Sequence, residues 1–260
     1  DRPMKVNLFG IGSAKCGTTT LFDILNRHPD VCGSRVKEAD FFANERNYNY
    51  GENWYHEINF SHYSGQLHVL DFTPNYSGVS FSTAAKRISL YNPNAKLIYI
   101  LRDPFDKLKS GWQMCLRNYE MKICTDNPAV SWARYGFSEW VGQQWASGHI
   151  KSLYYGKIIN EYLKFFPRSS LYITTLESLS QSYRDEILRL LNFLGLPESA
   201  FDFSSPVQSN SRKGQVGRFS FLARIIEGSL LSRMPKAQRL CYGLRTQWLL
   251  KNLPLSLIHI

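Results

Sequence analysis

The sequence predicts an α/β protein in which helices flank a central parallel sheet. Strand-like apolar runs alternate with amphipathic helical segments, which is typical of a parallel sheet covered on both faces. Residues 97–101 are apolar throughout, as expected for a strand buried on both sides. A glycine-rich turn joins the first predicted strand to the first helix, and such an arrangement commonly binds anions.

Each predicted element follows from local signals. Apolar residues recur at helical spacing in the helices, and proline or glycine marks several of their ends. Pro104 stands at the first position of one helix, where the missing N–H is tolerated. Strands are expected within 5–12, 66–74, 95–104 and 170–179, and helices within 18–29, 81–93, 104–117, 138–148, 154–167 and 182–197. No repeat or linker interrupts this order, so we expect one domain over 1–260, although the pattern indicates no role for 220–260.

The composition indicates a globular protein with an anionic partner. The chain has 260 residues, of which 43% are hydrophobic and 20% charged, so it can bury a sizeable core. Its net charge of +10 favours a partner such as a nucleotide, a sulfated glycan, a nucleic acid or anionic lipid. A generally basic surface is the alternative. No apolar run is long enough to predict a membrane span.

The five cysteines do not form a metal-binding pattern. No C-x-x-C pair occurs, which argues against a structural zinc site, and we expect no metal. Cys115 and Cys124 are close enough in sequence to form a disulfide, which would imply an oxidising compartment. The sequence leaves this pairing open.

The stretch GSAKCGTTT has the layout of a phosphate-binding loop with its lysine displaced. Gly12 and Gly17 keep the spacing of the nucleotide-hydrolase loop, but Thr18 follows Gly17, and Lys15 lies inside the loop. Backbone N–H groups of residues 13–17 would surround an anion at the positive end of the following helix. A turn needed only for chain reversal would require neither a lysine nor three successive threonines.

A second basic segment follows the 95–104 strand. Arg102 ends that strand, and Ser110 lies on the next helix. Arginine can bind a phosphate through two N–H groups, and serine can add a third donor. Alternatively, Arg102 forms an ion pair with Asp103 or Asp106.

Together with the late segment RKGQVG, these motifs resemble the sulfotransferases that use 3′-phosphoadenosine 5′-phosphosulfate (PAPS). GSAKCGTTTL is similar to the family's 5′-phosphosulfate loop, and LIYILRDPFDKLKSGW is similar to its 3′-phosphate motif. The resemblance covers roughly 5–217, is closest to the carbohydrate (glycosaminoglycan-type) branch, and implies the P-loop-like sulfotransferase fold. The donor-binding residues that it implies are Lys15, Cys16, Gly17, Thr18, Thr19, Thr20, Arg102, Ser110, Arg212, Lys213 and Gly214.

The resemblance implies an enzyme that moves a sulfuryl group from PAPS to an acceptor hydroxyl, which in this branch belongs to a carbohydrate, and that releases adenosine 3′,5′-bisphosphate (PAP). Lys15 would neutralise the leaving oxygen during in-line transfer. Positioning and electrostatics would supply most of the catalysis, as in phosphoryl transfer, and no metal is required.

The motif EADFF places Glu38 where the carbohydrate branch has its general base. The cytosolic small-molecule branch uses a histidine instead, and His56, His62 and His68 are candidates by position only. Burial would raise the pKa of Glu38, whereas the neighbouring Lys37 would lower it.

Four further residues are candidates for binding the acceptor: Lys37, Asp40, Asp71 and Phe72. The carbohydrate branch often has a lysine immediately before Thr-Pro, where this chain has Phe72. This departure weakens the assignment of any particular glycan.

Two other functions remain as alternatives. A P-loop kinase or NTPase would need a lysine after Gly17 and a magnesium-binding aspartate, for which Asp71 and Asp103 are available. A non-catalytic basic module would bind anionic glycans, but it would leave Glu38 without a role; we expect no nucleic-acid partner.

The resemblance implies a Golgi-lumen enzyme whose membrane anchor, if any, lies outside these residues, and a cytoplasmic location is the alternative.

Overall fold

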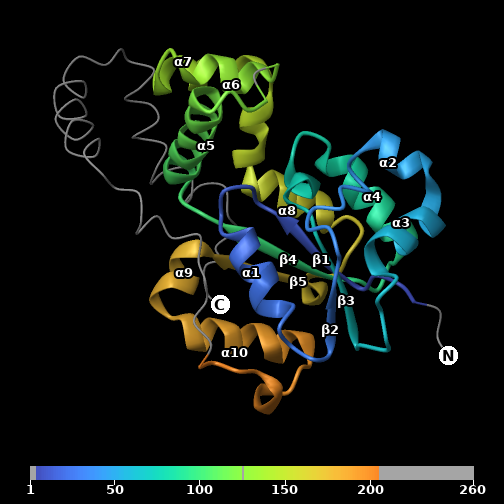
Figure 1. Cartoon of the computed structure of the whole chain (residues 1–260). Helices are drawn as coiled ribbons and strands as arrows, with labels where there is room; N and C mark the ends of the chain where they lie inside the picture. The colour runs from blue at the N-terminus through green and yellow to red at the C-terminus, as the bar shows by residue number, and fades with distance from the viewer. Residues whose placement is uncertain (1–3, 125, 205–260) are drawn as a thin grey trace. The chain divides into compact units, whose positions relative to one another are not determined.

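A computed structural model describes residues 4–124 and 126–204 (Figure 1). The chain divides into two compact units, Asp1–Arg102 with Asp106–Pro206 and Asp103–Phe105 with Val207–Ile260. Almost all described residues belong to the first unit. The predicted ligands Arg212, Lys213 and Gly214, and the segment 220–260, lie outside the described residues. The expectation of a single domain over 1–260 stays a prediction.

The first unit is built on a five-stranded parallel sheet. Its strands are β1 (Leu8–Gly12), β2 (Val31–Gly33), β3 (His68–Phe72), β4 (Lys96–Leu101) and β5 (Leu171–Thr175), and their order is β2-β3-β1-β4-β5. Every neighbouring pair is parallel, and β1 is buried along its whole length. The segments that follow β1, β3 and β4 therefore leave the same edge of the sheet side by side.

Helices cover both faces of this sheet, which confirms the predicted α/β class. In Figure 1, α1, α9 and α10 lie on one side of the strands, and α4 and α8 lie on the other. The α-helices are α1 (Thr18–Leu25), α2 (Glu45–Asn49), α3 (Gly51–Phe60), α4 (Phe81–Tyr91), α5 (Pro104–Glu120), α6 (Pro128–Ala133), α7 (Phe137–Ala146), α8 (Tyr155–Tyr162), α9 (Leu176–Gln181) and α10 (Tyr183–Leu194). Short 3-10 turns η1 (Pro74–Ser77) and η2 (His149–Leu153) follow β3 and α7.

The four predicted strands correspond to β1, β3, β4 and β5. The strand β2 was missed because three residues are too few to show a period. The predicted 170–179 strand is too long, because Thr175 Oγ1 accepts a hydrogen bond from Ser178 N at 3.0 Å and thereby caps α9. The helices α2, α3 and α6 were also not predicted.

The open question of a Cys115–Cys124 disulfide receives a structural answer in the described part. Cys115 and Cys124 are both free thiols, so they form no disulfide with each other in this structure. Between residues 4 and 204, with 125 left aside, no group of three or more His, Cys, Asp or Glu side chains could hold a metal ion. No helix within the same residues is long and apolar enough to cross a membrane.

Candidate functional site

The loop 12–17 is attached to the ends of the central strands. Ser13 N donates to the carbonyl oxygen of Ile100 at 2.8 Å, which fixes the start of the loop to β4. Arg102, directly after β4, donates from Nη1 to the carbonyl oxygen of Lys15 at 3.2 Å. The structure thus brings the two predicted donor-binding motifs into direct contact.

The backbone of the loop requires its two glycines. Gly12 and Gly17 have φ values of 136° and 89°, and a Cβ at Gly17 would lie 2.7 Å from Leu176. Lys15 also has a positive φ, 67°, which costs a non-glycine residue about 1–2 kcal/mol. Its ammonium group donates to Met114 Sδ on α5 at 3.2 Å. The lysine therefore lies between the loop and α5.

The residues at the start of α1 complete the loop. Gly17 is the N-cap residue, provides no side-chain cap, and no acidic residue stands in the first turn. No side chain therefore caps the first N–H groups of α1. Together with the hydroxyls of Thr18, Thr19 and Thr20, these N–H groups are available to bind an anion at the loop. Cys16 is fully buried beneath it, and burial raises the pKa of its thiol.

Lys107 belongs to this site but was not predicted. Its buried ammonium group donates to Ser13 Oγ at 2.5 Å and to Ser152 O at 2.7 Å. Ser110 is also buried, one helical turn further along α5, so it shares a face with Lys107. The sequence offered one usable signal, the position of Lys107 between the predicted ligands Arg102 and Ser110.

The segment 37–40 carries the predicted base. The side chain of Glu38 is 54% exposed, and its Oε1 accepts a hydrogen bond from Lys37 Nζ at 2.7 Å. Glu38 and Asp40 both have positive φ, at 71° and 48°. The rings that follow anchor this strained segment, because Phe41 stacks on Tyr55 at 4.4 Å and is buried in the core.

Asp40 fastens the segment to the end of β3. Its backbone N–H donates to Thr73 Oγ1 at 3.2 Å, and its carboxylate accepts from Asn75 Nδ2 at 3.0 Å and Asn44 Nδ2 at 3.4 Å. Burial raises the pKa of Asp40, the two amide hydrogen bonds lower it, and the charge of Glu38 raises it further. Glu38 is therefore held near the edge of the sheet from which the loop 12–17 also emerges.

Asp71 and Phe72, two of the candidate acceptor-binding residues, lie in β3. Both are fully buried. The carboxylate of Asp71 accepts hydrogen bonds from Tyr55 OH at 2.7 Å, Tyr76 OH at 2.6 Å and Thr73 Oγ1 at 2.8 Å. Burial raises its pKa, and these three donors lower it. Since Thr73 also binds Asp40 N, Asp71 supports the 37–40 segment from inside the core.

The three histidines bind other parts of the fold. The Nε2 atoms of His56, His62 and His68 lie 2.7 Å from Tyr91 OH, 3.0 Å from Gly33 O and 2.9 Å from Leu194 O. Burial lowers the pKa of His56 and of His68. Each ring thus joins structural elements of the fold.

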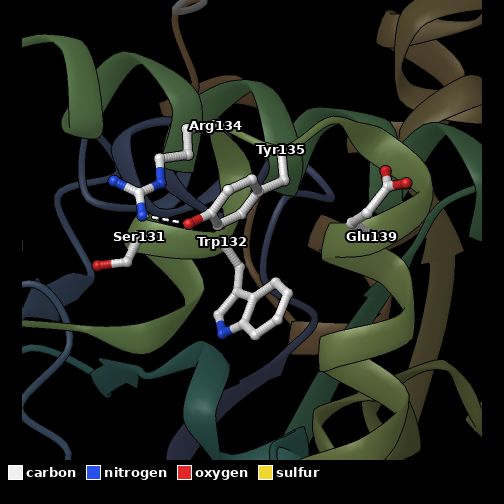
Figure 2. Close-up of a pocket in the computed structure, with 5 residues that line it drawn as sticks. All are labelled: Ser131, Trp132, Arg134, Tyr135 and Glu139. Atoms are coloured by element: carbon white, nitrogen blue, oxygen red, sulfur yellow. Dashed lines mark hydrogen bonds between the residues drawn. The ribbon is translucent and has the colours of Figure 1, made fainter.

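A separate pocket lies on α6 and α7 (Figure 2). It has a volume of about 580 Å³ and is lined by Ser131, Trp132, Arg134, Tyr135 and Glu139. The guanidinium group of Arg134 lies 4.4 Å from the centre of the Tyr135 ring and donates to its hydroxyl, as Figure 2 shows. None of these residues was predicted as a site residue, and none belongs to the loop 12–17 or the segment 37–40.

Comparisons with known proteins bear on the family and the fold of the chain. A family model described as "Sulfotransferase domain" matches residues 7–215. Heparan sulfate glucosamine 3-O-sulfotransferase 6 of Homo sapiens is 28% identical over 197 residues, which are 74% of this chain and 53% of that protein. Bifunctional heparan sulfate N-deacetylase/N-sulfotransferase 4 of Mus musculus is 27% identical over 241 residues, 88% of this chain and 26% of that protein.

A solved structure supports the fold. A sulfotransferase from Alicyclobacillus acidocaldarius superposes with a TM-score of 0.61 at 23% identity and covers 78% of this chain and 87% of that chain. At this identity the likeness concerns the fold alone. The chain spans about half the length of the first of the two curated relatives and about a quarter of the second.

Proposed function

The chain belongs to the sulfotransferase domain family, and on that premise we propose that it transfers a sulfuryl group from PAPS to a hydroxyl group of a carbohydrate. One observation carries the proposal: Lys15 is fixed inside an anion-binding loop by Arg102, the first residue after the neighbouring strand. A P-loop NTPase would have its lysine after Gly17, so the family and the loop both argue against that alternative.

The residues of the loop fit an anionic donor. Bound PAPS would supply an activated sulfuryl group on a phosphate leaving group. Backbone N–H groups of residues 13–17 and the hydroxyls of Thr18, Thr19 and Thr20 would bind the 5′ end, and Lys15 would move from Met114 to the leaving oxygen. For the ammonium group of Lys15, a charged oxygen of PAPS would then replace Met114 Sδ, which is a weak hydrogen-bond acceptor.

The other donor ligands are part of the same proposal. Arg102 and Ser110 would bind the 3′-phosphate, since both lie at the carboxyl end of β4 and the start of α5. The resemblance also implies Arg212, Lys213 and Gly214 as donor ligands, and these lie outside the described residues. Charge neutralisation by Lys15 and Arg102 would make a metal unnecessary for this transfer.

Glu38 would accept the proton of the acceptor hydroxyl. Its carboxylate is exposed, its backbone is fixed by Asp40 and Phe41, and Lys37 orients one of its oxygens. Lys37 would also attract an anionic glycan. Asp71 would act indirectly, by holding Thr73 and through it Asp40.

The acceptor class is proposed by analogy with the curated relatives, whose names specify heparan sulfate. We infer by the same analogy a Golgi-lumen location, with any membrane anchor outside these residues. Incubation with labelled PAPS and a panel of heparan-type, chondroitin-type and uncharged glycans tests the proposal. Label should enter at least one polymer. Label transfer to none of them, together with hydrolysis of ATP in magnesium, would instead favour an NTPase.

A further inference from the structure

A buried lysine lies beneath the loop. The ammonium group of Lys107 donates to Ser13 Oγ at 2.5 Å, Ser152 O at 2.7 Å and Ser152 Oγ at 3.2 Å. It also lies 5.3 Å from the centre of the Tyr155 ring. All its hydrogen-bond acceptors are neutral, and within the described residues it forms no ion pair. Buried lysines are normally paired, because an isolated buried charge costs several kcal/mol.

The thiol and phenol groups described around Lys107 supply no negative charge at neutral pH. Burial is the main cause that raises the pKa of the Cys16 thiol and of the Tyr99 and Tyr155 phenols, so all three stay protonated. Arg102, whose carbonyl oxygen accepts a hydrogen bond from Tyr155 OH at 2.9 Å, adds a further positive charge. Positive charge is therefore concentrated under a loop whose backbone can bind an anion.

We propose that Lys107 is a positioning residue of the donor site: it ties Ser13 in the loop to Ser152 in η2 and supplies positive charge to the anion bound there. This inference rests on the proposed function, because it takes the 5′-phosphate of the nucleotide as that anion. Lys107 would act through Ser13 and through its field, without touching the reacting atoms.

The inference predicts a pH dependence of nucleotide binding. Burial lowers the pKa of Lys107 to about 8. An anion in the loop favours the charged ammonium group and raises this pKa. Below about pH 8, Lys107 is charged in both the free and the bound protein. As the pH rises further, the free protein loses the proton and the complex keeps it, so binding takes up a proton and affinity falls.

Calorimetry with two nucleotides tests this on the unmodified protein. PAP and adenosine 3′-monophosphate, which lacks the 5′-phosphate, are titrated at pH 7 and pH 9 in two buffers of different ionisation enthalpy. We expect proton uptake on PAP binding to be small at pH 7 and to approach one proton at pH 9, with no uptake for the monophosphate. No uptake at pH 9, or equal uptake for both nucleotides, would overturn the inference.

Variants test whether Lys107 is the residue that takes up this proton. Lys107→Met should weaken PAP binding at pH 7 about tenfold, leave monophosphate binding unchanged and abolish the proton uptake. Lys107→Arg should restore most of the affinity without the pH dependence, and Lys151→Met, which removes an exposed lysine next to Ser152, should change neither. If Lys107→Met does not fold, the measurement on the unmodified protein still decides. Failure of that protein to bind PAP would refute the proposed function, whereas equal PAP binding by all variants would refute only the role of Lys107.

Discussion

The two halves of the candidate site are built differently. The donor half, the loop 12–17 with Arg102, is attached to central strands by backbone and arginine hydrogen bonds. The acceptor half, the segment 37–40, is irregular and contains two positive-φ residues that Thr73 and Asn75 hold through Asp40. We infer that strands fix the position of the donor, whereas a locally fastened segment presents the base to the acceptor. Changes in one half should therefore leave the function of the other intact.

Removal of the proposed base should have the largest effect. Glu38→Gln keeps the shape of the side chain but cannot accept the proton, so kcat should fall by about 10²–10⁴. PAP affinity should stay unchanged, because Glu38 belongs to the acceptor half. The exposed Glu57→Gln on α3 is the matched control. Near-normal turnover of the Glu38 variant would exclude it as the base.

Removal of the loop lysine should affect both binding and turnover. Lys15→Ala deletes the charge proposed to support the leaving oxygen, so kcat should fall by about 10²–10³. PAP binding should also weaken, which distinguishes this variant from Glu38→Gln. Lys157→Ala, at an exposed position of α8, is the control. If the Lys15 variant and the original protein bind PAP with equal affinity, Lys15 does not contribute to binding of the donor.

Removal of one hydrogen-bond donor to the Asp71 carboxylate should affect the stability of the fold more than the rate of catalysis. Tyr76→Phe removes a buried 2.6 Å hydrogen bond to a carboxylate, which should lower the free energy of unfolding by about 1.5–3 kcal/mol. Urea unfolding followed by two probes measures this, with the exposed Tyr50→Phe as the control. PAP affinity should be retained. A drop in PAP affinity without a loss of stability would mean that the hydrogen bonds to the Asp71 carboxylate support the donor half.

Changes in the α6–α7 pocket should have the smallest effect. The pair Trp132→Ala and Arg134→Ala alters the pocket of Figure 2, whose lining residues belong to neither half of the site. PAP affinity should therefore stay within about twofold, as is usual for surface changes remote from a ligand. A large loss measured by calorimetry would link this pocket to the donor.

The sequence predicted the arrangement of the loop 12–17 and Arg102 better than that of the segment 37–40. Gly12, Lys15 and Gly17 are adjacent along the chain, and strand order brings Arg102 to them, so spacing and α/β rules were sufficient. Lys107 was missed because its partner Ser152 is 45 residues away and no local pattern marks a buried lysine.

The acceptor half depends on contacts that sequence order does not reveal. Asp71 follows the pattern of a residue near a strand end, yet Tyr55 and Tyr76 enclose it in the core. The positive φ of Glu38 depends on Phe41 and Asp40 being anchored elsewhere. Such long-range packing explains why the motif could single out Glu38 as a candidate base but could not predict the arrangement around it.

The structure of the complex with PAP tests the central claim most directly. The account predicts the 5′-phosphate within the loop 12–17, with Lys15 Nζ turned from Met114 Sδ toward that phosphate and Arg102 still bound to the carbonyl oxygen of Lys15. A bound nucleotide whose 5′ end lies elsewhere, with Lys15 still on Met114, would contradict it.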